Sequence, residues 1–335
     1  MQQPLVSILI PFKNTVDFIE ECLQSICLQT YDNWELIAVN DHSTDQSKNL
    51  VTTYHNSDSR IQVLDNTGVG IIPALQTGYK QSKGQFITRM DSDDIMTPNK
   101  LMVMVNSLQK HRPGHLAVGQ VKYFSASGIS DGYSRYEKWL NELTMNGTNY
   151  SEIYKECVIP SPCWMAYRED LDLCGAFESN RYPEDYDLAF RFYAYGLKCI
   201  PSSEILHHWR DYDHRTSRTS THYAENYFLD IKLHYFLKLH HCKSRPLVVW
   251  GAGTKGKSIA KSLIEKKVDF YWVCDNPKKI GKDIYGKQML HYATLTEFTR
   301  PQLIITVANR DAQKMIYKFL LELKQENMKD YFFFC

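Results

Sequence analysis

Several features are missing from this sequence, and each absence argues against a class of protein. No apolar run reaches the roughly 18–20 residues that a membrane-spanning helix needs. Lysine and arginine number 39 against 38 aspartates and glutamates, so the net charge of +1 favours neither nucleic acid nor an acidic membrane as a partner. The nine cysteines form no C-x-x-C pair, which argues against a disulfide framework and a zinc site. Met1-Gln2-Gln3-Pro4 carries no basic, signal-like region. We therefore expect a cytoplasmic protein that does not bind nucleic acid.

Strand-like and helix-like segments alternate along the first part of the chain. A length of 335 residues, 43% of them hydrophobic, suits two domains. Buried-strand patterns cover 5–10, 35–39, 60–64 and 85–90. Helical spacing of apolar residues covers 15–30 and 71–82, and another helix is expected to start near 43–45. This alternation predicts an α/β fold with a mostly parallel, doubly wound sheet.

Polar residues gather where the expected strands end. They are Asn14 after the first strand, Asn40 and Asp41 after the second, Asn66 after the third and Asp91 after the fourth. In open α/β sheets, ligands bind outside the carboxyl ends of the strands. The coincidence of these polar residues predicts a ligand site along this edge of the sheet.

Three carboxylates, Asp91, Asp93 and Asp94, fall within four positions after the fourth strand. Clustered carboxylates at a strand end indicate either a divalent-metal site or a solvated acidic turn, in which Asp94 could cap a helix that starts near Pro98. Mg²⁺ and Mn²⁺ prefer oxygen ligands and often bridge to phosphates. A cation would also offset the mutual repulsion of the carboxylates, so we favour the metal site.

A second acidic pair, Glu184-Asp185, follows Pro183 at the expected start of a helix over 183–195. Taken alone, the pair is ordinary first-turn helix charge. Further on, 207–223 is rich in His, Arg, Ser and Thr and predicts a loop or lid. Arg210 and Arg218 in this tract could clamp a diphosphate with paired hydrogen bonds, or could belong to a solvated basic loop.

The C-terminal part begins a second alternating unit. A long helix is expected over about 223–241 and a linker near 240–246, followed by a strand at 247–250. Gly251, Gly253 and Gly256 follow this strand and open a helix, and Asp275 lies 19 positions after Gly256. This is the dinucleotide-binding fingerprint in its expected context. On its own it would support an NAD(P)-binding oxidoreductase or sensor. Because no paired catalytic His or Tyr-Lys residues accompany it, we favour a degenerate Rossmann-like module for packing, oligomerisation or acceptor handling.

Four stretches together resemble family 2 glycosyltransferases of the GT-A fold. They are Pro11-Phe12-Lys13-Asn14, the V-N-D-H-S-T-D turn at 39–45, the G-Q-F-I-T-R-M-D-S-D-D stretch at 84–94 and Pro183-Glu184-Asp185-Tyr186-Asp187-Leu188. They occur in the order typical of that family, and the resemblance covers about 4–225. It implies a GT-A mixed, doubly wound sheet and a sugar-nucleotide-dependent, inverting transferase that uses Mn²⁺ or Mg²⁺.

The resemblance also implies roles for individual residues. Asp185 would be the catalytic base, while Asp91 and Asp93 would hold the metal. Asp41 would hydrogen-bond the nucleobase, usually uracil. The full expected donor site is Pro11, Phe12, Asn14, Asp41, Asn66, Arg89, Asp91, Arg210 and Arg218. Arg89 could instead pair with the acidic cluster and have a structural role.

The sequence departs from the family pattern at three places. Asn40 replaces the usual first aspartate of its turn, and His42 stands where glycine is common. Many members carry a histidine that joins the metal shell, and Tyr212 aligns best with it. His207, His208 or His214 could substitute, but adjacent residues on an extended chain point to opposite sides, so at most one of His207 and His208 can serve. We keep His208 as the candidate.

These observations predict three segments. Residues 1–225 would form the GT-A domain, 226–245 a helix and linker, and 246–335 a small Rossmann-like domain. The expected reaction moves a sugar from a nucleotide sugar, usually a UDP-sugar, to a glycan or lipid-linked acceptor, at the inner face of the membrane if the acceptor is lipid-linked. The competing hypotheses are the oxidoreductase or sensor and a non-catalytic sugar-nucleotide-binding protein. Homo-oligomerisation and the choice of sugar stay open.

Overall fold

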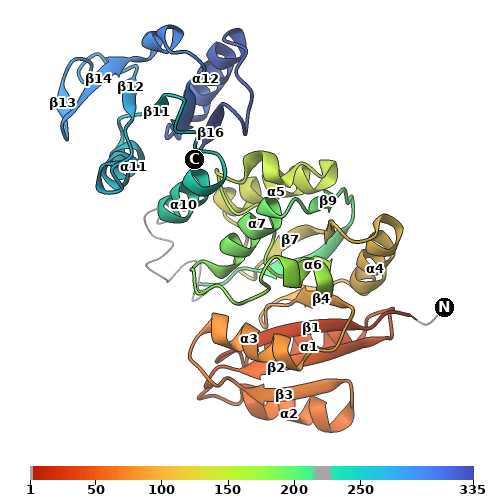
Figure 1. Ribbon diagram of the computed structural model, residues 1–335. Helices are drawn as coiled ribbons and strands as arrows, with labels where there is room; N and C mark the ends of the chain where they lie inside the picture. Colours follow the sequence, from red (N-terminus) through yellow and green to blue (C-terminus); the bar gives the residue numbers. More distant parts are fainter. Residues whose placement is uncertain (1–2, 214, 216–227) are drawn as a thin grey trace. The chain divides into compact units, whose positions relative to one another are not determined.

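The computed structural model describes residues 3–213, 215 and 228–335, which form two compact units (Figure 1). The first unit contains the described chain up to Tyr150 and Cys157–Arg215. The second contains Ser151–Glu156 together with 228–335. The C-terminal unit therefore includes a short segment that the sequence pattern did not assign to it. Among the described residues, no helix combines the length and the apolar character that crossing a bilayer requires.

A seven-stranded mixed sheet forms the centre of the first unit, in the order β3-β2-β1-β4-β8-β6-β9. Strands β1 to β4 are parallel, β8 is antiparallel to β4 and β6, and β9 is parallel to β6. Their bounds are β1 Val6–Phe12, β2 Trp34–Asn40, β3 Ile61–Asp65, β4 Phe86–Arg89, β6 His115–Val118, β8 Trp164–Tyr167 and β9 Lys198–Ile200. The expected α/β class and mixed, doubly wound sheet are confirmed.

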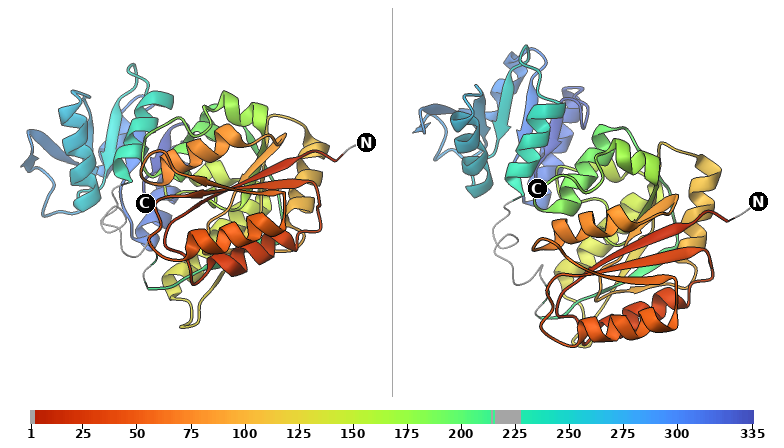
Figure 2. Two further views of the ribbon diagram at one scale, coloured as in Figure 1. Left: turned by 90° about the horizontal axis from the view of Figure 1, so that it is seen from below. Right: turned by 60° about the horizontal axis from the view of Figure 1, so that its bottom comes forward.

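Helices cover both faces of this sheet. Figure 2 shows α1 (Ile19–Cys27) and α2 (Ser47–Ser57) on one face and α3 (Ile71–Gln81) on the other. Helix α1 begins later than the expected 15–30 because Thr15 to Phe18 form a turn, in which Phe18 N donates to the Thr15 carbonyl at 2.9 Å. The remaining helices are α4 Lys100–His111, α5 Asp131–Asn146, α6 Arg168–Leu173 and α7 Glu184–Ala194, with a 3₁₀ turn η1 at Asn149–Glu152.

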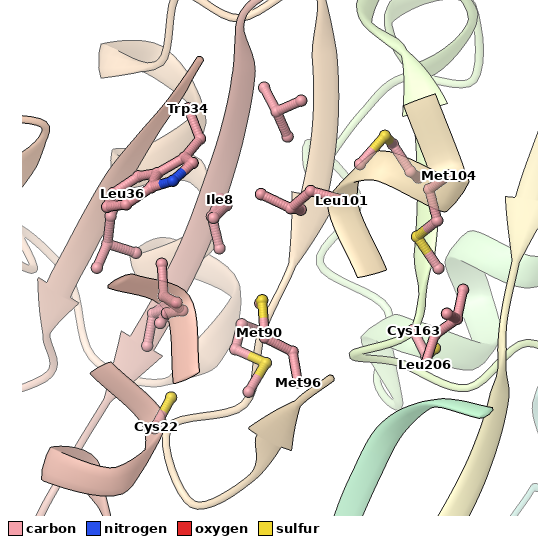
Figure 3. Packing of buried hydrophobic residues seen from close by; sticks show 14 of the residues in the cluster. Ile8, Cys22, Trp34, Leu36, Met90, Met96, Leu101, Met104, Cys163 and Leu206 are labelled. Carbon is pink, nitrogen blue, oxygen red and sulfur yellow. The ribbon is translucent and has the colours of Figure 1, made fainter. Parts of the chain in front are cut away.

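The main hydrophobic core lies between the sheet and the helices α1, α2 and α4. Ile8 and Leu36 come from adjacent strands, Cys22 comes from α1, and Met90 follows β4 (Figure 3). Each of these side chains is fully buried. Burial of a side chain such as Ile or Leu contributes about 1.5–3 kcal/mol. This core therefore holds the carboxyl end of β4 and the loop after it, 91–94, in a fixed place; we call this segment, with Asp91, Asp93 and Asp94, the acidic loop.

A three-stranded sheet brings a distant part of the chain beside that loop. Strand β10 (Ile205–Arg210) pairs antiparallel with β5 (Ile95–Met96) and parallel with β7 (Gln120–Phe124). Because β5 directly follows the acidic residues, the pairing of His207 with Met96 and of His208 with Ile95 sets which side chains of β10 face the acidic loop.

The second unit has its own six-stranded sheet, in the order β13-β14-β12-β11-β15-β16. All neighbours are parallel except the β13–β14 pair. Strands β14-β12-β11-β15-β16 therefore follow the doubly wound order of a Rossmann-like half, as the sequence predicts. The elements are α10 Leu229–Leu239, β11 Leu247–Trp250, α11 Thr254–Glu265, β12 Tyr271–Cys274, β13 Asp283–Ile284, β14 Lys287–His291, η2 Tyr292–Glu297, β15 Gln302–Ile305, α12 Arg310–Glu322 and β16 Tyr331–Phe333.

Candidate functional site

Asp91 is held by the last residue of β4. The Arg89 guanidinium donates from Nε and Nη2 to Asp91 Oδ1 at 3.1 and 2.9 Å. Ser161 Oγ lies 3.4 Å from Asp91 Oδ2. Burial raises the pKa of Asp91, but the charges of Arg89 and Arg215 and the hydrogen bonds from Arg89 act together against burial and hold this pKa below its ordinary value. Asp91 is therefore a charged carboxylate in a fixed orientation.

Asp93 lies in a more repulsive setting. Tyr212 donates its hydroxyl to Asp93 Oδ2 at 2.9 Å, and Arg210 Nε donates to the Asp93 carbonyl at 2.7 Å. Burial, followed by the charges of Asp94 and Asp91, raises the pKa of Asp93 to about 7. The residue that aligns with the metal-shell histidine of the family thus contacts Asp93, although a tyrosine stands there.

Asp94 does not cap a helix. It is fully buried, and its Oδ2 hydrogen-bonds His207 Nε2 at 2.9 Å while its Oδ1 accepts from the Arg210 backbone N–H at 2.8 Å. His207 Nδ1 in turn accepts from Lys100 Nζ at 3.3 Å, and that ammonium also donates to the Pro162 carbonyl at 2.6 Å. Asp94 therefore ties β10 to the acidic loop, which rules out the capping alternative.

The two adjacent histidines of β10 lie on opposite faces of the strand, as expected. His207 is fully buried, and burial together with the Lys100 charge lowers its pKa well below the usual value. His208 is partly buried and packs edge-on against Phe124, with ring centroids 6.3 Å apart. The histidine that faces the acidic loop is thus His207, and Asp94 and Lys100 occupy both of its ring nitrogens. His214 and Arg218 lie outside the described residues.

Arg210 reaches the acidic loop from β10. Besides its two bonds to the loop, its guanidinium pairs with Glu21 and lies over the rings of Phe18 and Phe124, at 4.9 and 4.6 Å from the centroids. These contacts place a permanent positive charge beside Asp93. Arg215 lies over the Trp209 ring at 5.1 Å, and its charge opposes the rise in the pKa of Asp93 without cancelling it.

Asp41 stands at the end of β2 in a polar frame. Its Oδ1 accepts from Asn66 Nδ2 at 2.7 Å and from the Gly70 N–H at 2.9 Å. Lys13 Nζ lies 3.7 Å from Asp41 Oδ2. Asn66 is nearly buried, and its hydrogen bond orients the Asp41 carboxylate. The frame leaves Oδ2 as the oxygen that a ligand donor could approach.

The first-strand residues divide into buried and exposed groups. Phe12 is 2% exposed and belongs to the hydrophobic core, whereas Pro11 is partly buried and Asn14 is exposed. Asn14 has φ of 51°, and its Oδ1 accepts from the Thr44 N–H at 2.8 Å. His42 does adopt the positive φ that the family's glycine suggests, at 57°, and its Nε2 lies 2.7 Å from the Gly68 carbonyl oxygen.

Helix α7 brings the second acidic pair to the cluster. Glu184 Oε1 accepts from Arg89 Nη1 at 2.8 Å. Burial and the neighbouring Glu184 charge raise the pKa of Asp185 to about 7, although the Arg89 charge opposes them. A helix N-terminus lowers the basicity of a carboxylate, so burial and like charge win here. Asp185 has the basicity that proton abstraction near neutral pH requires.

The acidic loop suits a divalent cation as part of a larger ligand shell. Across the described ranges, no group of three His, Cys, Asp or Glu side chains is placed to hold a metal by itself. Asp91 and Asp93 nevertheless offer the hard oxygen donors that Mg²⁺ and Mn²⁺ prefer, and such ions commonly complete their shells with phosphate and water. The raised pKa of Asp93 shows that its negative charge is not fully balanced by the protein. The residues therefore fit a cation that a bound phosphate group helps to hold.

The glycine turn of the second unit has the geometry that its pattern predicts. Gly251 has φ of 125°, and a Cβ at Gly256 would lie 2.0 Å from the Gly251 carbonyl oxygen. A Cβ at Gly253 would meet nothing within 4 Å. Asp275 is exposed directly after β12, the strand beside β11. The first and third glycines thus serve the turn and close packing, and the second faces open space.

The family profile described as glycosyl transferase family 2 matches residues 7–174, about half of the chain. The chain belongs to glycosyl transferase family 2. It thereby belongs to a family of transferase enzymes. The matched residues contain β1 except Val6, the strands β2 to β4, Asp41 and the acidic loop, while Glu184, Asp185 and β10 lie beyond residue 174.

Two relatives illustrate this membership of family 2. Glycosyltransferase GlyG of Streptococcus pneumoniae serotype 4 (strain ATCC BAA-334 / TIGR4) is 37% identical over 214 residues, which cover 62% of this chain and 70% of GlyG. EpsH of Bacillus subtilis (strain 168), described as a glycosyltransferase, is 27% identical over 220 residues, which cover 63% of this chain and 62% of EpsH. The chain thus spans a little under two thirds of EpsH.

Solved structures share the fold of this family 2 chain. S. aureus TarS 1–349 in complex with UDP-GlcNAc has a TM-score of 0.53 at 16% identity, covering 77% of this chain and 71% of that one. Mannosyltransferase PcManGT from Pyrobaculum calidifontis, in complex with GDP-Man and Mn²⁺, has a TM-score of 0.52 at 18% identity, covering 71% and 64%. At these identities the likeness concerns the fold alone, and it confirms the expected GT-A architecture.

Several pairings within the site have no signal in the family 2 motifs, even where the residues themselves belong to a motif. The Arg89–Glu184 pair, the Lys100–His207–Asp94 chain and Ser161 join residues far apart in the sequence. In the sequence, Lys100 and Arg89 appear only as positive charges, and no local pattern identifies the groups that they contact. Tyr212 is the exception, because its alignment with the usual histidine already marked it.

Proposed function

We propose that this chain is a metal-dependent, inverting glycosyltransferase that moves a sugar from a UDP-sugar to a hydroxyl of a glycan or lipid-linked acceptor. The observation that carries the proposal is the presence of two acidic sites joined by one arginine. Asp91 and Asp93 lie in the acidic loop after β4, and Asp185 lies at the start of α7. Direct displacement needs acid–base and charge-stabilising groups in two separate places.

In this proposal, the nucleotide lies along the carboxyl ends of β1, β2 and β4. Asp41 Oδ2 would accept the N–H of a uracil ring, since Asn66 and Gly70 already engage Oδ1. Pro11 and the exposed Asn14 would border the same edge. Arg210, beside Asp93, would contribute positive charge toward the diphosphate, because guanidinium groups bind phosphates well.

Asp91 and Asp93 would hold Mn²⁺ or Mg²⁺. When bound, this cation supplies the positive charge that stabilises the departing diphosphate. The protein's own part is to keep Asp91 charged and oriented through Arg89 and to hold Asp93 through Tyr212. His208 would take no part, since its ring packs against Phe124.

Asp185 would act as the base. The acceptor hydroxyl oxygen forms its bond to the anomeric carbon while the bond from that carbon to the phosphate oxygen breaks. The hydroxyl proton passes to the Asp185 carboxylate, and the nucleoside diphosphate leaves with the electron pair. Attack opposite the leaving group inverts the anomeric configuration. The pKa of Asp185 of about 7 suits a base at neutral pH.

The nucleotide and the sugar need an experiment, because TarS was solved with UDP-GlcNAc and PcManGT with GDP-Man and Mn²⁺. We would record melting temperatures of the full chain with UDP, GDP, CMP and NAD⁺, each with and without Mn²⁺. A ligand that binds the folded state raises the melting temperature by mass action. A Mn²⁺-dependent shift with UDP that disappears in Asp93→Asn would support the proposal.

Two other outcomes would count against the proposal. A Mn²⁺-dependent shift with GDP in place of UDP would redirect the donor assignment and leave the remainder intact. A metal-independent shift with NAD⁺ alone would favour the glycine turn at 251–256 and Asp275 as the ligand site. Candidate UDP-sugars would then be tested for UDP release, with glycan and detergent-solubilised lipid-linked acceptors.

A further inference from the structure

Arg89 is more deeply engaged than a ligand-binding arginine at a strand end needs to be. Its side chain is 7% exposed, and it forms ion pairs with two carboxylates from different parts of the fold. Asp91 belongs to the loop after β4, and Glu184 belongs to the first turn of α7, 95 positions from Arg89. Both pairs have charged hydrogen bonds of 2.8–3.1 Å.

We propose that Arg89 and Glu184 form a positioning pair that sets Asp185 relative to Asp91. This inference rests on the proposed function, and it gives Arg89 a role other than donor binding. Arg89 would act through its neighbours: it orients the metal-side carboxylate with Nε and Nη2, and it holds the start of the base-bearing helix with Nη1.

The local chemistry of α7 supports this role. Glu184 and Asp185 are adjacent carboxylates in the first turn, and their like charges repel. Within the described part of the chain, Arg89 is the side chain that forms an ion pair with Glu184. Without that pair, no hydrogen bond from Arg89 would hold the first turn of α7, and the charge of Asp185 would drive this turn away from the negative charges of the acidic loop. Asp185 would move with it, because the two residues share the same helical turn.

The geometry of direct displacement shows why a link between the base and the metal-binding carboxylates would matter. In direct displacement, the base must lie on the side of the anomeric carbon opposite the leaving diphosphate. The distance from Asp185 to Asp91 and Asp93 therefore decides whether the acceptor hydroxyl, the anomeric carbon and the leaving group align. A misplacement of about 1 Å can cost about a hundredfold in rate. A buried arginine with a rigid planar fork suits this bridging task better than a flexible lysine.

The experiment uses Glu184→Ala and Glu184→Gln in the full chain. We would measure kcat and KM for UDP release from the UDP-sugar that the wild type turns over fastest, and the affinity for UDP with Mn²⁺ by calorimetry. We expect Glu184→Ala to lower kcat by about tenfold to a hundredfold. We expect UDP affinity to stay within about twofold, since a positioning loss acts on the transition state. Glu184→Gln should recover much of kcat, because its amide oxygen can still accept from Arg89.

A matched control comes from the same helix. Arg191 of the last turn of α7 pairs with Asp187 at 2.9 Å and also donates to the Ala176 carbonyl at 2.7 Å. Arg191→Lys weakens a comparable buried pair without touching Arg89 or Glu184. If this control loses as much kcat as Glu184→Ala, general loosening of α7 explains the effect and the inference is wrong.

Three further results have definite meanings. Unchanged kcat in Glu184→Ala would overturn the positioning role while leaving the proposed function in place. A parallel loss of kcat and UDP affinity would also overturn it, because the pair would then serve donor binding. If the wild type binds neither UDP nor GDP with Mn²⁺ and releases no nucleoside diphosphate from any UDP-sugar or GDP-sugar, the proposed function fails, and the inference fails with it.

Discussion

The rate of the proposed reaction should depend on pH through Asp185. A base works only when it is deprotonated, and the pKa of Asp185 is about 7. At one pH unit below that pKa, only about a tenth of the carboxyl groups carry the charge. The value of kcat should therefore fall about tenfold for each unit below neutrality and level off above pH 8. The rate rises with pH because the base is active only in its charged form. The pKa of Asp185 is raised from its usual value, so this rise occurs near neutrality and not near pH 4.

Saturating donor and divalent cation allow the titration of Asp185 to be distinguished from that of the other carboxyl groups in the site. Asp93 also has a pKa of about 7 in the free protein. With saturating donor and divalent cation, a metal-bound Asp93 stays charged, and kcat then reports groups of the complete complex. The assay is UDP release, measured from pH 5.5 to 8.5 at saturating Mg²⁺, donor and acceptor.

Two variants test the assignment. Asp185→Asn removes the base and should lower kcat by about a hundredfold to ten-thousandfold, and its residual rate should lose the limb near neutral pH. Asp131→Asn changes an exposed first-turn aspartate of another helix, α5, and should leave the profile unchanged. A flat kcat between pH 6 and pH 8 in the wild type, or a full rate in Asp185→Asn, would refute the reasoning.

Three further predictions concern binding and stability. Asp93→Asn should abolish the Mn²⁺-dependent shift with UDP without lowering the melting temperature of the ligand-free protein at pH 8, since it removes a poorly balanced buried charge; a large loss of ligand-free stability would contradict this. Gly256→Ala should destabilise the second unit by about 1–3 kcal/mol or more in chemical denaturation, because its Cβ would lie 2.0 Å from the Gly251 carbonyl oxygen. Gly253→Ala should leave the stability unchanged, since a Cβ at Gly253 meets nothing within 4 Å. Equal destabilisation by both variants would be inconsistent with the described turn. Lys100→Met should lower the free energy of unfolding by about 3 kcal/mol, since it leaves the Pro162 carbonyl without its bond; an unchanged denaturation midpoint would show that the buried ammonium is dispensable.

The sheet and the acidic loop were predictable because their signals are local. Each parallel strand is a short apolar run, and the polar residues stand directly after it. The parallel pairing of β1, β2 and β4 then brings Asp41 and Asp91 to one edge of the sheet. The order of strands, helices and polar residues along the chain is enough to predict this arrangement, so Asp41 and Asp91 can be placed from one sequence without an alignment.

The ion pairs of the site could not be predicted in the same way. His207 and His208 were expected to point to opposite sides, but strand periodicity does not say which one faces the acidic loop. The pairing of β10 with β5 decides it, and that pairing depends on contacts across more than a hundred residues. Similarly, nothing in the local sequence around Arg89 or Glu184 marks one as the partner of the other.

The basicity of Asp185 shows most clearly why a motif is not enough. Its place in the first turn of α7 predicts a lowered pKa, since the helix N-terminus favours the charged form. Burial and the adjacent Glu184 act in the opposite direction and prevail, against the further opposition of Arg89. The sign of the shift is therefore a balance among four effects, of which the sequence displays the helix start and the neighbouring charge. Burial and the distance to Arg89 arise only when α7 packs beside the end of β4. The chemistry of this carboxylate is accordingly a property of the assembled fold, and the same Glu-Asp pair on an exposed helix would be an ordinary acidic turn.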